Sequence, residues 1–334
     1  MAVVKPKWVK YRSMGGPRYL GKREGGKFVH VYDPPEPWGV WTQILGVVAR
    51  SEGRFDTVVM YDETGVTAGP FQWTFKSGRL QKMLEFFKTI PYYDFETGVE
   101  ANLFAEHCIK DGRQIFERFG FKIVGGRFSV PSSGKALNPS FKKQRDIIVD
   151  ICMGRRGFVG TPKQERAQAL ALCALFAELG QQPDVQAAMV EYAKLEFKKA
   201  LDVRRPPLKS VGGTIRCLLP DGVWGIPVPA IFFNLYQNSP GGAFKLFKGA
   251  MSEARRKGLL TLDATSGGSG YQMKGDDADK LLDIVWRRLN RSAYADWGFR
   301  SKQYLESDGK NPPRIKNIKP AIEEFYGLKL PYIY

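Results

Sequence analysis

Apolar residues recur with a helical period in the stretch "WGVWTQILGVVARSEG", which begins at residue 38. Its apolar positions follow i, i+3, i+4 and i+7 spacing: Trp41, Ile44, Leu45 and Val48. That spacing predicts one buried face of an amphipathic helix. Gly53 follows the last periodic positions, and glycine is a common helix terminator. The pattern therefore predicts a helix that ends beside Gly53.

Segments on both sides of this helix have the alternating pattern of strands. Residues 1 to 36 contain "KWVKYR" and "KFVHVYD", separated by glycine-rich turns, and this predicts a short β extension. After the helix, "FDTVVMYDETGVTAGPFQWTF" has β-branched and aromatic residues around the turn "DETG". This second segment predicts a small hairpin or an irregular β region.

The remainder of the chain reads as mainly helical. Ser77 precedes a periodic apolar segment and is a candidate helix cap. Thr161, Pro162 and Gln164 have the order of a capping box, and Gly180 ends the same pattern. Further amphipathic helices are expected in "PDVQAAMVEYAKLEFKKAL", "AFKLFKGAMSEARRKG" and "DDADKLLDIVWRRLNRSAYADW", with loops such as "TSGGSG" between them.

These elements predict a mainly α protein of the α+β kind. A helical domain would carry a small β hairpin directly after its first long helix. We expect two parts, an N-terminal β extension over residues 1–36 and a main domain with helical elaborations over residues 37–334.

Glu52 is the first candidate functional residue. It follows Trp41 by eleven residues, so on a helix of about 3.6 residues per turn it lies nearly in line with the apolar face. A carboxylate at such a position is costly unless it is neutral, paired or functional. Asp56, the other nearby carboxylate, is expected to be a solvated loop residue.

Glycoside hydrolysis needs groups of this kind. An acid with a raised pKa protonates the leaving oxygen, and a second carboxylate activates water or stabilises the oxocarbenium ion. Glu52 suits the first role. Asp62, in a polar turn, suits the second, and the Thr67 hydroxyl could hold the attacking water. The alternative is that Glu52 caps its helix and that Asp62 and Thr67 only stabilise a turn.

The segment from about residue 38 to 75 resembles the lysozyme superfamily, in which a helix-end glutamate is followed by a β hairpin across the cleft. Glu52, Phe55 and the Gly-x-x-Gln of Gly69 to Gln72 resemble lytic transglycosylases and goose-type lysozymes. The order Glu52, Asp62, Thr67 is similar to phage endolysins, and "DETGVTAG" is similar to the chitosanase branch. The spacing from Glu52 to Asp62 departs from both of the latter patterns.

Two later segments add to the resemblance. "AIFFNLYQNSPGGAFKLF" is similar to a helix-turn-helix found late in phage endolysins, and "LFAELGQQPDVQAAM" to another of their helical pairs. In the first of these, Asn234 and Tyr236 either line the cleft or belong to the core.

The resemblance implies a lysozyme-type muramidase that cleaves the bond between N-acetylmuramic acid and N-acetylglucosamine in bacterial peptidoglycan. Glu52 would be the general acid, with Asp62 and Thr67 positioning water. The candidate substrate-binding residues are Tyr61, Gly69, Gln72 and Trp73. Gln72 could instead satisfy buried backbone, and Trp73 could be a core residue rather than a platform for a sugar ring. This chemistry implies neither a metal nor an organic cofactor.

Composition changes the picture through charge. The 334 residues include 51 Lys and Arg against 34 Asp and Glu, a formal charge of +17. This favours a polyanionic partner, with the bacterial wall ahead of nucleic acid. Four dispersed cysteines and two histidines offer no zinc-ligand spacing and no His-dependent nucleophilic triad. We expect a monomer without a membrane span.

The N-terminal residues "MAVVKPKWVKYRSMGG" lack the apolar core of a secretory signal. The expectation is synthesis in a host cytoplasm and action on the wall after release by a holin, delivery with a virion, or injection. Three alternatives to a muramidase stay open: a lytic transglycosylase giving 1,6-anhydro products, a chitosanase, and a non-catalytic lysozyme-like phage protein that is structural or binds nucleic acid. A chitosanase ranks low because a cationic protein repels a cationic polymer.

Overall fold

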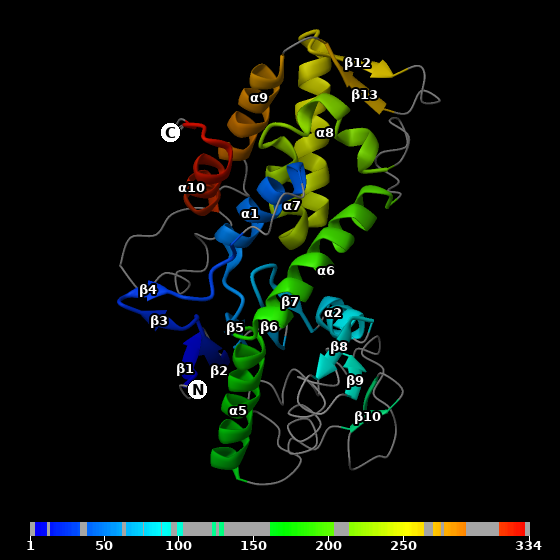
Figure 1. Ribbon diagram of the computed structural model, residues 1–334. Helices are drawn as coiled ribbons and strands as arrows, with labels where there is room; N and C mark the ends of the chain where they lie inside the picture. Colours follow the sequence, from blue (N-terminus) through cyan, green and yellow to red (C-terminus); the bar gives the residue numbers. More distant parts are fainter. Residues whose placement is uncertain are drawn as a thin grey trace. The chain divides into compact units, whose positions relative to one another are not determined.

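The structure is a computed structural model of the 334-residue chain. It describes residues 4–11, 14–33, 39–61, 65–75, 77–87, 89–94, 99–102, 122–124, 127–129, 161–203, 214–263, 270–274, 277–291 and 314–330. This part of the chain is mainly helical with antiparallel sheet, so the predicted mixed class is confirmed (Figure 1). Among these residues, no helix has both the length and the apolar character needed to cross a bilayer.

The chain divides into two compact units. Unit 1 comprises Met1–Tyr32 and Gly53–Tyr192, and unit 2 comprises Asp33–Glu52 and Ala193–Tyr334. The predicted domain boundary at residues 36 and 37 falls within 34–38, outside the described residues.

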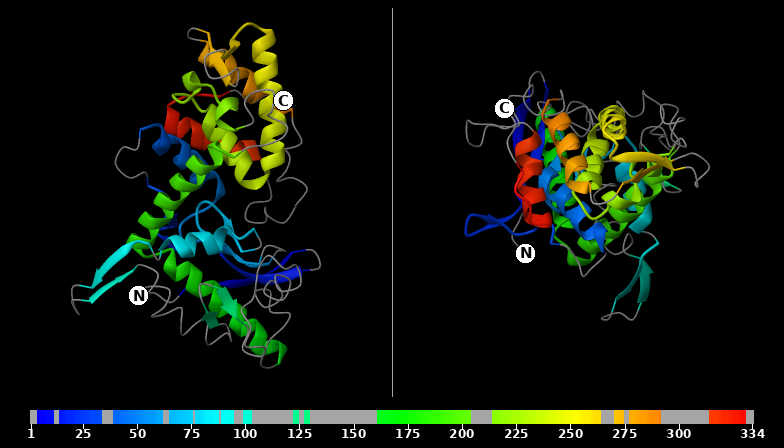
Figure 2. Two further views of the ribbon diagram at one scale, coloured as in Figure 1. Left: turned by 90° about the vertical axis from the view of Figure 1, so that its right-hand side faces the viewer. Right: turned by 90° about the horizontal axis from the view of Figure 1, so that it is seen from above.

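Unit 1 is built on a five-stranded antiparallel sheet in the order β1-β2-β5-β6-β7. Its strands are β1 (Lys7–Tyr11), β2 (Met14–Tyr19), β5 (Val58–Val59), β6 (Thr67–Ala68) and β7 (Trp73–Thr74). Helix α5 packs against β2 and β5, and α2 packs against β7 (Figure 2). Helix α5 spans Pro162–Leu179, and helix α2 spans Arg79–Phe87.

Both predicted β regions are present, and they form a single sheet. In the register of β2 and β5, Arg18 lies opposite Val59 and Tyr19 opposite Val58. The N-terminal strands therefore continue the β region that follows the first long helix. A separate two-stranded hairpin, β3 (Arg23–Glu24) and β4 (Lys27–Phe28), completes the N-terminal region.

Helix α5 begins as its sequence predicts. The side chain of Thr161 accepts a hydrogen bond from the Gln164 backbone N–H, while the Thr161 N–H donates to Gln164 Oε1 at 2.7 Å. Pro162 is the first helical residue and Gly180 the C-cap. The capping box and both termini of this helix are confirmed.

Unit 2 is a helical assembly. Its elements are α1 (Val40–Glu52), η3 (Arg216–Leu218), η4 (Asp221–Val223), α7 (Val228–Asn238), α8 (Pro240–Arg256), β12 (Leu260–Asp263), β13 (Gly270–Met273), α9 (Ala278–Asn290) and α10 (Arg314–Tyr326). Helix α1 packs against both α7 and α10, α7 against α8, and α8 against α9 (Figures 1 and 2). Helix α6 (Pro183–Leu201) contributes its last residues to this unit and its first ones to unit 1.

The apolar face predicted for α1 is the face that packs. Ile44, Leu45 and Val48 are fully buried, and Trp41 is half-buried against Phe233 of α7, with 5.7 Å between ring centroids. Because Gly46 has no side chain, α10 can approach closely: a Cβ there would overlap the ring of Phe325. The amphipathic period thus fixes which face of α1 meets its neighbours.

The prediction of a mainly helical remainder missed several short hairpins. Strands β12 and β13 pair where only a loop was expected. Two further pairs join β8 (Pro91–Asp94) to β9 (Val99–Asn102) and β10 (Lys122–Val124) to β11 (Arg127–Ser129). Strands of three or four residues are too short for a reliable period-2 signal.

Candidate functional site

Glu52 is the last residue of α1, as predicted. Its side chain is half-buried. One residue earlier, the Ser51 hydroxyl donates to the Val48 carbonyl oxygen at 3.0 Å, which satisfies one acceptor in the last turn of the helix. The helix therefore ends with its final carboxylate held close to the protein rather than extended into solvent.

Two amide groups from α7 hold this carboxylate. Asn238 Nδ2 donates to Glu52 Oε1 at 2.8 Å, and Asn234 Nδ2 donates to the same oxygen at 3.3 Å. The two asparagines are four residues apart, so both lie on one face of α7. The donors are neutral, and they orient the carboxylate without introducing a positive charge of their own.

Asn238 is itself fixed by its helix. Its Nδ2 also donates to the Asn234 carbonyl oxygen, one turn earlier, at 3.4 Å. An amide nitrogen carries two hydrogens, so one serves the helix and the other serves Glu52. Asn238 is thus a preorganised donor at the C-terminus of α7.

Asn234 is completely buried. Its Nδ2 also contacts Ser51 Oγ, while its Oδ1 is buried and has no hydrogen-bond partner in the described part of the chain. Leaving a buried carbonyl oxygen unpaired costs about 1–3 kcal/mol. If the Asn234 amide were flipped, its oxygen would face the Glu52 carboxylate and repel it. Glu52 therefore fixes the amide in the orientation that leaves Oδ1 unpaired.

Tyr236 supports the core alternative. Its ring stacks on Phe232 with centroids 5.7 Å apart and meets Phe244 edge-on at 6.0 Å. It belongs to the aromatic contacts between α7 and α8, whereas Asn234 and Asn238 belong to the polar contact with α1.

The predicted site residues Tyr61, Thr67, Gly69, Gln72 and Trp73 lie in or next to the sheet of unit 1. Asp62 falls in residues 62–64, outside the described residues. Thr67 is in β6, 8% exposed, and lies opposite Val59 and Thr74 in the sheet. Tyr61, which precedes Asp62, is buried.

Gly69 and Gln72 form a tight turn between β6 and β7. Gly69 has a φ of +76°, and a Cβ there would lie 3.0 Å from the Trp73 ring, so both conformation and space require glycine. The Gln72 N–H donates to the Gly69 carbonyl at 3.2 Å. Gln72 has a φ of +46°, the only positive φ at a non-glycine residue in the described chain.

Trp73 lies in the core of unit 1. It is fully buried, with ring centroids 5.3 Å from Phe71 and 5.8 Å from Tyr192. A ring covered in this way presents no face to a sugar, so the geometry favours the core alternative for Trp73. Gly69 is also buried, whereas Gln72 is half-buried. Of the predicted binding residues in this turn, Gln72 is therefore the one with accessible surface.

The expectation that Asp56 is a solvated loop residue is wrong. Asp56 is fully buried, and its Oδ2 accepts from the Lys22 backbone N–H at 2.8 Å and from Gln181 Nε2 at 3.2 Å. Burial raises the pKa of this carboxyl, and these hydrogen bonds and the positive potential of His30 oppose the rise. Its partners are distant in sequence, so the local loop pattern gave no sign of them.

Comparisons with family models, with curated proteins and with solved structures find no match for this chain. Within the described ranges, no group of three or more His, Cys, Asp or Glu side chains is arranged to hold a metal ion.

Asn238 is the site residue that sequence reasoning missed. The sequence does hold a signal: "NLYQN" places two asparagines one helical turn apart, at the end of a helix that is apolar from Val228 to Phe233. Such a pair predicts a polar partner on the facing element, and that partner is Glu52.

Proposed function

We propose that this protein is a peptidoglycan hydrolase of the muramidase type with a lysozyme-like arrangement around Glu52. The observation that carries the proposal is the Glu52 carboxylate, which ends α1 directly before the β5, β6 and β7 segment and is oriented by two amides of α7. A fixed carboxylate at a helix end is what proton transfer to a bound glycosidic oxygen requires.

The amides also distinguish the two oxygens of Glu52. Oε1 accepts from both asparagines, so a proton on Oε1 would compete with these donors. In the proposed acid the proton is therefore on Oε2, and Oε2 donates it to the bridging oxygen. After transfer, the developing negative charge is stabilised by the same two N–H groups.

Asp62, assisted by Thr67, is proposed to orient the attacking water on the opposite face of the ring. This division of labour requires the two carboxyl groups to be roughly 6.5–9.5 Å apart and gives a product inverted at the anomeric carbon. A separation of roughly 5 Å would instead fit a covalent intermediate. The formal charge of +17 supports attraction to the anionic wall.

A lytic transglycosylase is the second candidate, and the turn from Gly69 to Gln72 favours it. The sequence Gly-x-x-Gln resembles that family, and Gln72 has a left-handed backbone conformation, a kind of strain that is concentrated at functional sites. In this reaction Glu52 would be both acid and base, and the muramyl 6-hydroxyl would replace water. Asp62→Asn would then retain most activity.

The deciding experiment incubates the protein and Glu52→Gln with purified peptidoglycan and identifies the released fragments by mass spectrometry. Reducing muramic acid ends that depend on Glu52 are expected. Glu52-dependent 1,6-anhydro ends would replace the hydrolase with the transglycosylase.

Glu85→Gln is the matched control, because Glu85 is an exposed glutamate on α2. It should release the same fragments as the unmodified protein. If no wall type yields Glu52-dependent fragments, the enzyme proposal fails. Tight, salt-sensitive binding to DNA in that case would favour the non-catalytic alternative.

A further inference from the structure

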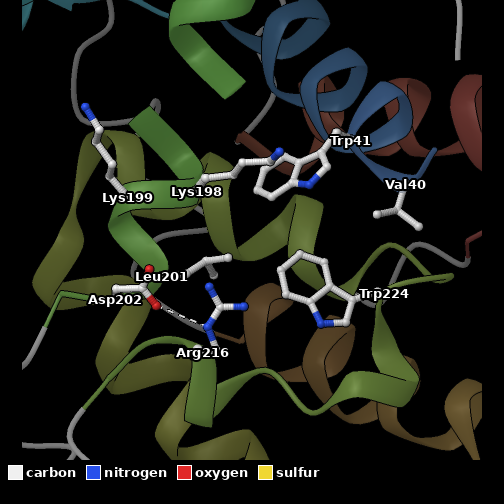
Figure 3. A pocket seen from close by; sticks show the side chains of 8 residues that line it. All are labelled: Val40, Trp41, Lys198, Lys199, Leu201, Asp202, Arg216 and Trp224. Atoms are coloured by element: carbon white, nitrogen blue, oxygen red, sulfur yellow. Dashed lines mark hydrogen bonds and ion pairs between the residues drawn. The ribbon is translucent and has the colours of Figure 1, made fainter. Parts of the chain in front are cut away.

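A hollow in unit 2 lies at the other end of α1 from Glu52. Its volume is about 380 Å³, and its lining residues are Val40, Trp41, Lys198, Lys199, Leu201, Asp202, Arg216 and Trp224 (Figure 3). This volume is within the range of roughly 300–1,000 Å³ found for small-molecule sites. Val40 and Glu52 are the first and last residues of α1, and at about 1.5 Å per residue they are about 18 Å apart along the helix.

Two indole rings form one side of the hollow. Trp41 and Trp224 have ring centroids 5.9 Å apart and an interplanar angle of 47°. Both are half-buried, so part of each ring stays accessible. Partly exposed indoles provide apolar faces against which a flat or ring-shaped ligand can pack.

Charged side chains complete the lining of the hollow. Arg216 Nε donates to Asp202 Oδ1 at 3.1 Å, and both side chains are largely exposed. Figure 3 shows the Lys198 side chain directed toward Trp41 and the Lys199 side chain directed away from it. The lining thus combines indole faces, three cationic side chains and a carboxylate.

We propose that this hollow binds an anionic saccharide, with a sugar ring on the indoles and its carboxylate near Lys198 and Arg216. The Asp202 carboxylate distinguishes a saccharide from a nucleic acid. A carboxylate accepts hydrogen bonds from the several hydroxyls of a saccharide that carries a single carboxylate, whereas it repels the phosphates that a nucleic acid carries at every nucleotide. The site is separate from Glu52 and acts in retention of the polymer rather than in bond cleavage.

A saccharide with a carboxylate is the chemistry of a muramyl residue. That assignment of the ligand rests on the proposed function, whereas the binding of an anionic saccharide here does not. A second site about 18 Å from the acid along α1 would hold a glycan strand after each cleavage event, and the two contacts would reinforce each other.

The test measures binding in the Glu52→Gln protein, which removes the proposed acid. The probe is the disaccharide of N-acetylglucosamine and N-acetylmuramic acid, titrated by calorimetry, with N,N′-diacetylchitobiose as the neutral comparison. The acidic disaccharide should bind more tightly. Trp224→Ala and Lys198→Gln should each weaken its binding about tenfold, with Trp224→Phe restoring most of it.

Lys245→Gln is the matched control, since it removes the same charge from an exposed lysine of α8 that does not line the hollow. Its affinity should stay within about twofold of the parent's, while thermal melts show that every variant folds. No binding of the acidic disaccharide, or equal binding by all variants, would overturn the proposal. Loss of single-stranded DNA binding in Trp224→Ala, with saccharide binding unchanged, would assign the hollow to nucleic acid instead.

Cleavage of purified wall by the unmodified protein is measured alongside. Absence of cleavage together with Trp224-dependent saccharide binding would refute the proposed function and leave this site standing. Glu52-dependent cleavage with no effect of Trp224 or Lys198 on binding would do the reverse.

Discussion

Asn238 Nδ2 and Glu52 Oε1 are 2.8 Å apart although the two residues are separated by 186 positions in the chain. The contact joins the C-terminal residue of α7 to the C-terminal residue of α1. Because Asn238 also donates to its own helix, the direction of its second N–H is set before any ligand binds. Glu52 is therefore a carboxylate whose orientation is determined by α7.

Asn238→Ala should slow wall cleavage by Glu52. A hydrogen bond to a charged group contributes about 1.5–3 kcal/mol, which corresponds to roughly 10- to 100-fold in rate if it is fully used in the reaction. The measurement is the initial rate of fragment release from purified peptidoglycan. Asn290→Ala is the matched control, because Asn290 ends α9 and donates to the Trp286 carbonyl one turn earlier. Equal rates in the two variants would show that Asn238 does not support Glu52.

Gly180→Ala should strongly destabilise unit 1. The backbone of Gly180 is in the right-handed helical region, with a φ of −67°, so alanine fits its conformation. A Cβ there would overlap the Phe55 carbonyl oxygen and lie 2.6 Å from the carbonyl carbon. Because backbone cannot move aside as a side chain can, we expect a loss of about 3 kcal/mol or more in the free energy of unfolding. Urea denaturation measures this loss. Gly225→Ala is the comparison, because a Cβ at Gly225 would have no other atom within 4 Å. A loss below about 1 kcal/mol in Gly180→Ala would contradict the close packing.

Local features of the fold were predictable because they depend on neighbours in sequence. The buried face and the end of α1, and the capping box of α5, follow from residues within one or two turns of each other. A period of 3.6 residues, a cap and a terminating glycine are all short-range signals. The same kind of signal identified Glu52 as a carboxylate placed on a buried face.

Contacts between distant segments were not predictable in this way. The pairing of β2 with β5, the burial of Asp56 and the contact of Asn238 with Glu52 each join segments that lie far apart in sequence. Tertiary packing decides such contacts, and a pattern of polarity does not specify the partner. Strand β12 is an intermediate case, since the alternation in "LTLD" was visible but too short to outweigh the helical segments around it.

Asp56→Asn should change how stability depends on pH. The pKa of Asp56 is raised, chiefly by burial, above the unfolded value of about 3.9. Its contribution to stability is therefore fully present below the unfolded pKa and is lost as pH rises through the folded pKa. The free energy of unfolding of the natural protein, minus that of Asp56→Asn, should fall as pH rises from 4 toward neutrality.

Urea denaturation at a series of pH values measures this difference. Asp279→Asn, a change at an exposed aspartate of α9, serves as the reference. A difference for Asp56→Asn that stays constant from acid to neutral pH would show that the buried carboxyl titrates alike in the folded and unfolded chains, contrary to its burial.

Gln72→Gly should separate stability from activity. Gln72 has a φ of +46°, a region that costs a residue with a side chain roughly 1–2 kcal/mol and glycine almost nothing. Relief of this strain stabilises the Gln72→Gly variant. Two effects destabilise it: the loss of the side-chain contacts, and the greater backbone freedom of glycine in the unfolded chain. We expect Gln72→Gly to be at least as stable as the natural protein, and Gln72→Ala, which keeps the strain, to be less stable than Gln72→Gly by about 1 kcal/mol.

If the side chain binds the glycan, both variants should lose cleavage activity to a similar degree, with the loss in KM. Variants that keep full activity would assign Gln72 to the turn alone, because an amide that contacts substrate cannot be removed without loss of binding.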